Sequence, residues 1–199
     1  MGANTGTWTR LALSIFPSTP VLMIEPQDEM QKYLAPLCKG SPECTYIKAG
    51  VGREAGELVQ TIWEDLAGSS FLPETTDEGL KSGRQRRTKV VTINAVLSEL
   101  HKNFHPDLVK LDIQGFELEA LSGAQTTFGM TEVYILETAL FHYMPRWPLT
   151  REVISFMSEK GYELYDITGY LRRPHDGALG IVDIAFVKSE GMFRRDSAW

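Results

Sequence analysis

Three short, largely apolar segments of this chain each end in a carboxylate. The carboxylates are Glu25, Asp112 and Glu137, which follow residues 21–24, 108–111 and 133–136. Short apolar runs of this kind are typical of buried strands, and stretches with helical periodicity, such as residues 150–160, lie between them. Helices that alternate with strands favour an α/β fold whose mostly parallel sheet is covered on both faces.

The last two expected strands, residues 162–167 and 180–187, follow one another without an intervening helix. They should therefore pair antiparallel at one edge of the sheet. The chain has 199 residues and neither an internal repeat nor a linker, which predicts a single domain over residues 1–199. Residues 64–87 are the least regular stretch and are interpreted as a functional or mobile loop.

Composition excludes several classes of partner. The chain carries 20 Lys plus Arg against 26 Asp plus Glu, so its formal net charge is −6. A nucleic-acid or anionic-membrane surface would need an excess of basic residues, and neither partner is expected. There is no long apolar run or signal-peptide pattern, and Cys38 and Cys44 form neither a disulfide framework nor a zinc motif. These features predict a cytoplasmic protein without a metal site and leave its oligomeric state open.

A glycine-rich loop, GANTG at residues 2–6, precedes a helical stretch and then the first carboxylate. Gly6 and Glu25 are 19 positions apart, close to the ~20 that separate a phosphate-type loop from a ribose-binding acid in Rossmann-like folds. The loop lacks the third glycine of the dinucleotide motif. Asn4 and the loop carbonyls offer mixed donors and acceptors, which suit a cofactor with an amino-acid tail, such as S-adenosylmethionine.

Ligands of open α/β sheets bind beyond the carboxyl ends of the strands, where the three carboxylates are expected to lie. Glu25 could accept hydrogen bonds from both ribose hydroxyls. Asp112 and Glu137 are candidates to orient or deprotonate an acceptor. His142, in a loop after the third of these strands, is another candidate base because its ordinary pKa suits proton removal. The alternative is that His142 is a packed residue.

The segment KLDIQGFELEALSGA at residues 110–124 resembles the K-(I/L)-D-(V/I)-(E/Q)-G-x-E-x-x-x-L-x-G-A block of the FkbM family of S-adenosylmethionine-dependent methyltransferases. The similarity extends along the chain. Residues 2–8 resemble the family's first motif, residues 24–26 its ribose-acid motif, and residues 68–70 its Ser-Ser loop.

The resemblance implies a Rossmann-like class I methyltransferase fold, S-adenosylmethionine as cofactor, and methyl transfer to a hydroxyl of a sugar, polyketide or similar small molecule. It places the cofactor against Gly2, Ala3, Asn4, Gly6, Glu25, Pro26, Gly50, Val51 and Asp112. Within this set, Gly2, Asn4 and Gly6 would face the methionine end, and Gly50 and Val51 the adenine. The catalytic candidates are Asp112, Glu137 and His142.

One departure from the family concerns the first strand and its terminal Asp, which normally stand directly before Gly2. Here Met1 occupies that position. We therefore expect a domain that is N-terminally truncated relative to the family and lacks its first strand. Gln114 occupies a position that is often Glu, although the family uses both residues.

Three alternative interpretations remain at this level. One is a non-catalytic or truncated cofactor-binding remnant of the same fold. A second is a nicotinamide-dependent oxidoreductase, which the incomplete glycine motif disfavours. A third is a nucleic-acid or protein methyltransferase. Methylases that act on base amino groups typically carry (D/N)-P-P-(Y/F), whereas this chain has DIQG at residues 112–115.

Overall fold

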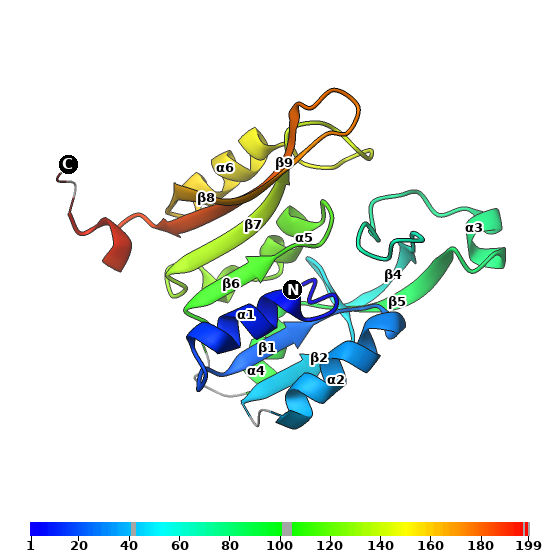
Figure 1. Ribbon diagram of the computed structural model, residues 1–199, viewed down its shortest axis with the longest axis horizontal. Coiled ribbons are helices and arrows are strands. Elements are labelled where there is room, and N and C mark those ends of the chain that lie inside the picture. Colours follow the sequence, from blue (N-terminus) through cyan, green and yellow to red (C-terminus); the bar gives the residue numbers. More distant parts are fainter. Residues whose placement is uncertain (41–42, 101–104, 197, 199) are drawn as a thin grey trace.

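The computed structural model describes residues 1–40, 43–100, 105–196 and 198. The helices are α1 (Thr7–Ile15), α2 (Gln31–Gly40), α3 (Asp77–Lys81), α4 (Ile93–Leu100), α5 (Glu117–Ser122) and α6 (Thr150–Glu159). The strands are β1 (Val21–Ile24), β2 (Cys44–Ile47), β3 (Gly50–Val51), β4 (Gly56–Thr61), β5 (Gln85–Val91), β6 (Leu108–Leu111), β7 (Val133–Ala139), β8 (Tyr162–Arg172) and β9 (Leu179–Lys188). Strands and helices alternate along much of the chain, so the α/β expectation is confirmed (Figure 1).

The strands form three hydrogen-bonded groups, β1-β2, β3-β5-β4 and β6-β7-β9-β8. The expectation of a mostly parallel sheet is wrong, because three of the six strand pairings are antiparallel. The physical reason is that β4 pairs antiparallel with β5 across the long connection at residues 62–84, and that β9 lies between β7 and β8 and runs antiparallel to both. The antiparallel pairing of the last two strands is confirmed, with β8 at the edge of its group.

Met1 and Gly2 connect two of these groups. The Met1 amino nitrogen donates to the Lys110 carbonyl at 2.6 Å, and the Asp112 amide donates to the Met1 carbonyl at 3.3 Å. On the other side, the Gly2 amide donates to the Ile24 carbonyl at 3.0 Å. These bonds hold the carboxyl ends of β1 and β6 on either side of the N-terminal loop.

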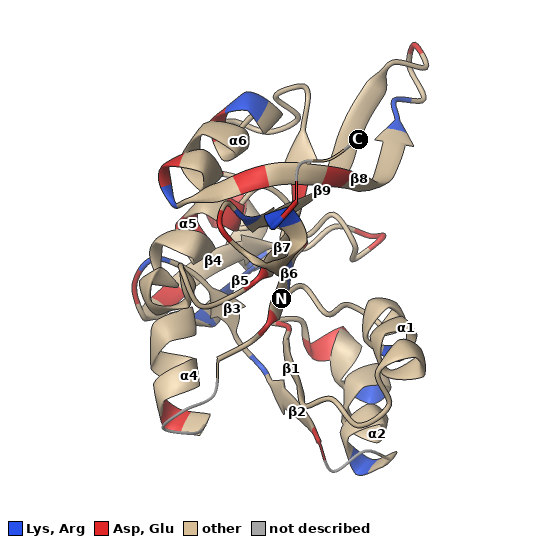
Figure 2. Ribbon diagram, turned by 90° about the vertical axis from the view of Figure 1, so that its left-hand side faces the viewer, with Lys and Arg blue, Asp and Glu red and all other residues tan. Residues whose placement is uncertain are grey.

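Helices flank the strands on two sides. Figure 2 shows α4, α5 and α6 on one side and α1 and α2 on the other. The main core lies under the first set, and its fully buried members include Leu111, Leu121, Tyr134 and Leu136. Within the described residues, none of the helices combines the length and apolar character needed to cross a bilayer.

The stretch at residues 64–87 is more regular than its sequence suggests. It contains α3, and β5 begins at Gln85, inside the basic run KSGRQRRTK at residues 81–89, whose composition is typical of a solvated loop. Arg86 contacts both carboxylate oxygens of Glu29 at 2.8 and 2.9 Å, and Arg87 lies 3.3 Å from a Glu57 oxygen. Acidic neighbours therefore allow basic residues to occupy a strand.

Candidate active site

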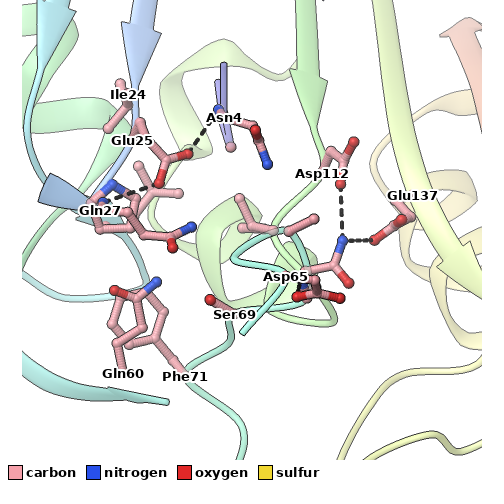
Figure 3. A pocket seen from close by; sticks show the side chains of 18 of the residues that line it. Asn4, Ile24, Glu25, Gln27, Gln60, Asp65, Ser69, Phe71, Asp112 and Glu137 are labelled. Atoms are coloured by element: carbon pink, nitrogen blue, oxygen red, sulfur yellow. Dashed lines mark hydrogen bonds between the residues drawn. The ribbon is translucent and has the colours of Figure 1, made fainter. Parts of the chain in front are cut away.

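A cavity of about 380 Å³ lies beyond the carboxyl ends of β1, β6 and β7 (Figure 3). Its walls come from the N-terminal loop, the residues after β1, the β3–β4 region, and the loop that follows β4. The lining residues are Gly2, Asn4, Ile24, Glu25, Pro26, Gln27, Ala49, Gly50, Val51, Gln60, Asp65, Ala67, Gly68, Ser69, Phe71, Asp112, Ile113, Gln114, Glu137, Leu171 and Ile181. Glu25 and Asp112, which directly follow β1 and β6, thus share one cavity with Glu137, which lies within β7 near its end.

Glu25 is held in place by two backbone amides. Its Oε2 accepts a hydrogen bond from the Asn4 amide and its Oε1 from the Gln27 amide, each at 3.0 Å. Burial raises the pKa of Glu25, while these two hydrogen bonds lower it. Because an ionised carboxylate oxygen can accept more than one hydrogen bond, each oxygen can still receive a donor from a ligand.

The glycine-rich loop divides into residues that face the cavity and residues that pack beneath it. Gly2 has φ +70°, and a Cβ there would lie 1.8 Å from the Asp112 carbonyl oxygen, so only glycine allows this close approach. Asn4 also lines the cavity. Ala3 packs against a hydrophobic cluster between β1 and α2 that includes Met23 and Leu34. A Cβ on Gly6 would lie 2.6 Å from Leu37. Ala3 and Gly6 therefore support the loop without lining the cavity.

Opposite Glu25, an amide joins two carboxylates. Gln114 Nε2 donates to Asp112 Oδ1 at 3.1 Å and to Glu137 Oε2 at 2.9 Å (Figure 3). Gln114 has φ +56°, an uncommon conformation for a residue with a side chain, and Gly115 follows at +89°. Lys110 Nζ lies 2.8 Å from the other Asp112 oxygen. The backbone turn thus fixes two carboxylates side by side, as a base and an orienting group require.

Electrostatics at this side of the cavity favour a protonated Glu137 in the absence of a ligand. Its residue is only 8% exposed, and burial raises the pKa of Glu137 well above its ordinary value, with further contributions from Asp112, Glu117 and Asp183. Among the described residues that line the cavity, the ones with ionisable side chains are Glu25, Asp65, Asp112 and Glu137, all of them acidic, and none is Lys, Arg or His. The cavity therefore suits neutral or cationic ligands.

Glu117 supports the turn from below. It is 2% exposed, and its Oε1 accepts the Ile113 amide at 2.9 Å. Burial raises the pKa of Glu117 to about 8, so the side chain is largely neutral at pH 7. Lys110 and Glu117 thus support this corner through an ion pair with Asp112 and a contact to the Ile113 backbone, respectively.

Replacing Glu117 with glutamine should flatten the pH dependence of stability. The folded protein keeps its proton up to about pH 8, whereas the unfolded chain releases it near 4.5, so this residue makes stability fall as pH rises through that window. Glutamine retains the carbonyl that accepts the Ile113 amide but does not titrate. Denaturant melts at about pH 5 and about pH 8 should give a smaller difference for Glu117→Gln than for wild type. Equal differences would contradict this role, and Glu119→Gln on the same helix is the matched control.

His142 lies outside the cavity. Its side chain is exposed, and its Nδ1 lies 3.1 Å from the carbonyl oxygen of Trp147. Trp147 itself is buried in a small hydrophobic cluster with Leu72 and Ala139. The structure therefore does not bring His142 together with Asp112 and Glu137. His101, for which the sequence predicts a surface position, falls outside the described residues. So does Trp199, whose sequence context allows either a substrate gate or packing at the core or rim.

Several lining residues were not identified from the sequence, notably Gln27, Gln60, Asp65 and Phe71. Of these four residues, only Gln27 could have been proposed from the sequence, because it stands two residues after Glu25. The irregular segment 64–87 contributes to the cavity wall through Ser69 and its neighbours. In the part of the chain that the structure describes, no group of three or more His, Cys, Asp or Glu side chains is arranged to hold a metal ion.

Comparison with known proteins agrees with this geometry. The family model described as "Methyltransferase FkbM domain" matches residues 1–164, which include every element from α1 to α6. Comparisons with curated proteins and with solved structures gave no match. The family match covers most of the chain and includes all three carboxylates and the glycine-rich loop. The chain therefore belongs to the FkbM methyltransferase family.

Proposed function

We propose that this protein transfers a methyl group from S-adenosylmethionine to a hydroxyl oxygen of a small molecule, such as a sugar or a polyketide. One observation carries the proposal. A single cavity has a buried, doubly hydrogen-bonded Glu25 on one side and the Asp112–Gln114–Glu137 cluster on the other. This arrangement fits a nucleoside cofactor at one end and a reacting hydroxyl at the other. The site at the strand ends also supports a Rossmann-like assignment of the fold.

The residues present fit this cofactor. The two Glu25 oxygens would accept hydrogen bonds from the ribose hydroxyls, and Pro26 and Gln27 flank that position. Gly2 and Asn4 would line the methionine end, where glycine permits close backbone approach. Gly50 and Val51, both buried, would border the adenine. When bound, S-adenosylmethionine supplies an electrophilic methyl group on a sulfonium.

The protein's own groups would manage the acceptor. Asp112, held by Lys110 and Gln114, would orient the hydroxyl by accepting its hydrogen bond. Glu137 in its ionised form would accept the proton as the oxygen becomes bonded to carbon, and its raised pKa makes that carboxylate a stronger base than an ordinary glutamate. Leu171 and Ile181 border the cavity and would help to keep water away.

The charge of the cavity narrows the acceptor class. Its described lining residues carry carboxylates and no cationic side chain, so an acceptor with a phosphate, sulfate or carboxylate near its reacting hydroxyl would be repelled. We therefore place the acceptor among neutral polyols and amine-bearing alcohols.

Glu25→Ala is expected to weaken the binding of S-adenosylhomocysteine by about 1.5–3 kcal/mol, the range for hydrogen bonds to a charged group. The loss follows from the two ribose contacts that the carboxylate would make. Calorimetry on the wild type and the variant measures it directly. Glu57→Ala, which removes an exposed carboxylate of β4, is the control and should bind normally. Unchanged affinity in a folded Glu25→Ala protein would remove Glu25 from the cofactor site.

A further inference from the structure

Two buried amide oxygens, in residues that line the cavity, have no hydrogen-bond partner among the described residues. They are Oε1 of Gln27 and Oε1 of Gln60, in residues that are 5% and 2% exposed. Most buried polar atoms in proteins are paired, because an unpaired acceptor loses its hydrogen bonds to water without replacement. Both residues line the same cavity. Both oxygens have almost no accessible surface in the free protein, so a ligand in the cavity would supply donors to them after a rotation of the terminal carboxamide, a torsion with a broad energy profile.

Gln27 is oriented by a contact on its far side. Its Nε2 donates to the Leu66 carbonyl at 3.0 Å, which leaves Oε1 as the free atom. Its backbone amide already holds Glu25, so this oxygen lies next to the proposed ribose position. The expected donor for Gln27 is therefore a sugar hydroxyl.

Gln60 occupies a different part of the wall. It belongs to β4, and Figure 3 shows it together with Phe71 on the same side of the cavity as Glu25, away from Asp112 and Glu137. A ligand whose reacting end lies at Asp112 and whose ribose lies at Glu25 would thus direct its base toward Gln60. The order of these residues along the wall matches the order of groups in an adenosyl cofactor.

Phe71 gives this end of the cavity an aromatic wall. A Cβ on Gly50 would lie 2.6 Å from Phe71 Cζ, so the ring rests directly on the Gly50 backbone. A second ring, Phe116, supports it at a centroid distance of 5.5 Å. The side chain of Val51 is buried in the same wall. A flat aromatic group would find one stacking surface here and one amide at its edge.

We infer that Gln60 is the residue that selects adenine, with its carboxamide pairing to the amino edge of the base while Phe71 stacks on the ring. In this arrangement Oε1 accepts a hydrogen from the exocyclic amine, and Nε2 donates to the neighbouring ring nitrogen. Glutamine is suited to this pairing because its amide offers one donor and one acceptor side by side, as an adenine edge does. The inference rests on the proposed function, since it concerns the base of the proposed cofactor.

The test compares two ligands on three proteins by calorimetry. One ligand is S-adenosylhomocysteine, and the other is its analogue with hydrogen in place of the 6-amino group of the purine. Wild type should bind the analogue about 10- to 100-fold more weakly, the range for one bidentate amide–base pair. Gln60→Leu should bind both ligands with similar affinity. Gln27→Leu should weaken both equally and keep the wild-type ratio, because its partner is the sugar.

A second measurement separates recognition from a structural role. Without ligand, Gln60→Leu should melt at or above the wild-type temperature, because the variant no longer buries an unpaired carbonyl. Its melting temperature should rise less than that of wild type when S-adenosylhomocysteine is added. A variant that keeps the full preference for the amino group would overturn the assignment of Gln60 alone. Failure of wild type to bind S-adenosylhomocysteine would overturn the proposed function and this inference together.

Discussion

Asp112→Asn is expected to lower the rate of methyl transfer by about 100-fold or more while leaving the affinity for S-adenosylhomocysteine nearly unchanged. Asparagine has the same shape and keeps one oxygen that can accept the Gln114 amide hydrogen. It loses the negative charge that pairs with Lys110 at 2.8 Å and that would hold the acceptor hydroxyl. Single-turnover rates at saturating acceptor, together with calorimetry for the cofactor product, measure the two effects separately.

Asp107→Asn is the matched control for this experiment, because Asp107 is an exposed acid just before β6. It should leave both the rate and the affinity unaltered. If Asp112→Asn turned over at a near-normal rate, Asp112 would have no essential part in orienting the acceptor. Glu137 or proximity alone would then carry the reaction.

Glu137→Gln should produce a loss of similar size and also change the shape of the pH–rate profile. A base acts in its deprotonated form, so the wild-type rate should increase with pH as Glu137 ionises. Because burial and nearby carboxylates raise the pKa of Glu137, that increase should occur well above the range of an ordinary glutamate. Glutamine cannot take up the proton, so its residual activity should lack this rise.

The companion variant for this profile is His142→Gln. His142 is exposed and hydrogen-bonded to the Trp147 carbonyl outside the cavity. Its replacement should therefore leave the pH–rate profile as in wild type. Loss of the rise in His142→Gln, with the rise retained in Glu137→Gln, would transfer the role of base from the carboxylate to the imidazole.

The parts of the fold that could be predicted from the sequence depend on local patterns. The three apolar runs formed strands as expected, because a short apolar run indicates burial. Glu25 and Asp112 directly follow β1 and β6, whereas β7 continues to Ala139, so Glu137 lies within the strand and not at its end. Helix α6 formed as predicted, since its Val153 and Met157 recur at helical spacing and are buried. The pairing of β4 with β5 was harder to predict, because residues 62–84 separate the two strands and because Arg86 and Arg87 give β5 the composition of a solvated loop. The ion pairs of these arginines with Glu29 and Glu57 become apparent only in the fold.

Some residues of the candidate site could likewise be predicted from local sequence patterns, and others could not. Glu25 and Asp112 follow their strands directly, so the general rule for α/β sheets located them. Gln60 reaches the cavity only because β4 pairs with β5, which a one-dimensional pattern does not encode. His142 was a reasonable candidate by residue type. The ring of His142 is instead hydrogen-bonded to the carbonyl of Trp147. Because Trp147 packs in a separate hydrophobic cluster, His142 lies outside the cavity.

The central claim is that this cavity binds an S-adenosyl cofactor, and titration of S-adenosylhomocysteine into the wild-type protein tests it most directly. The expected result is saturable binding of one molecule per chain, a rise in melting temperature with added ligand, and no binding of NAD under the same conditions. The absence of heat with S-adenosylhomocysteine, or binding of NAD in its place, would contradict the claim.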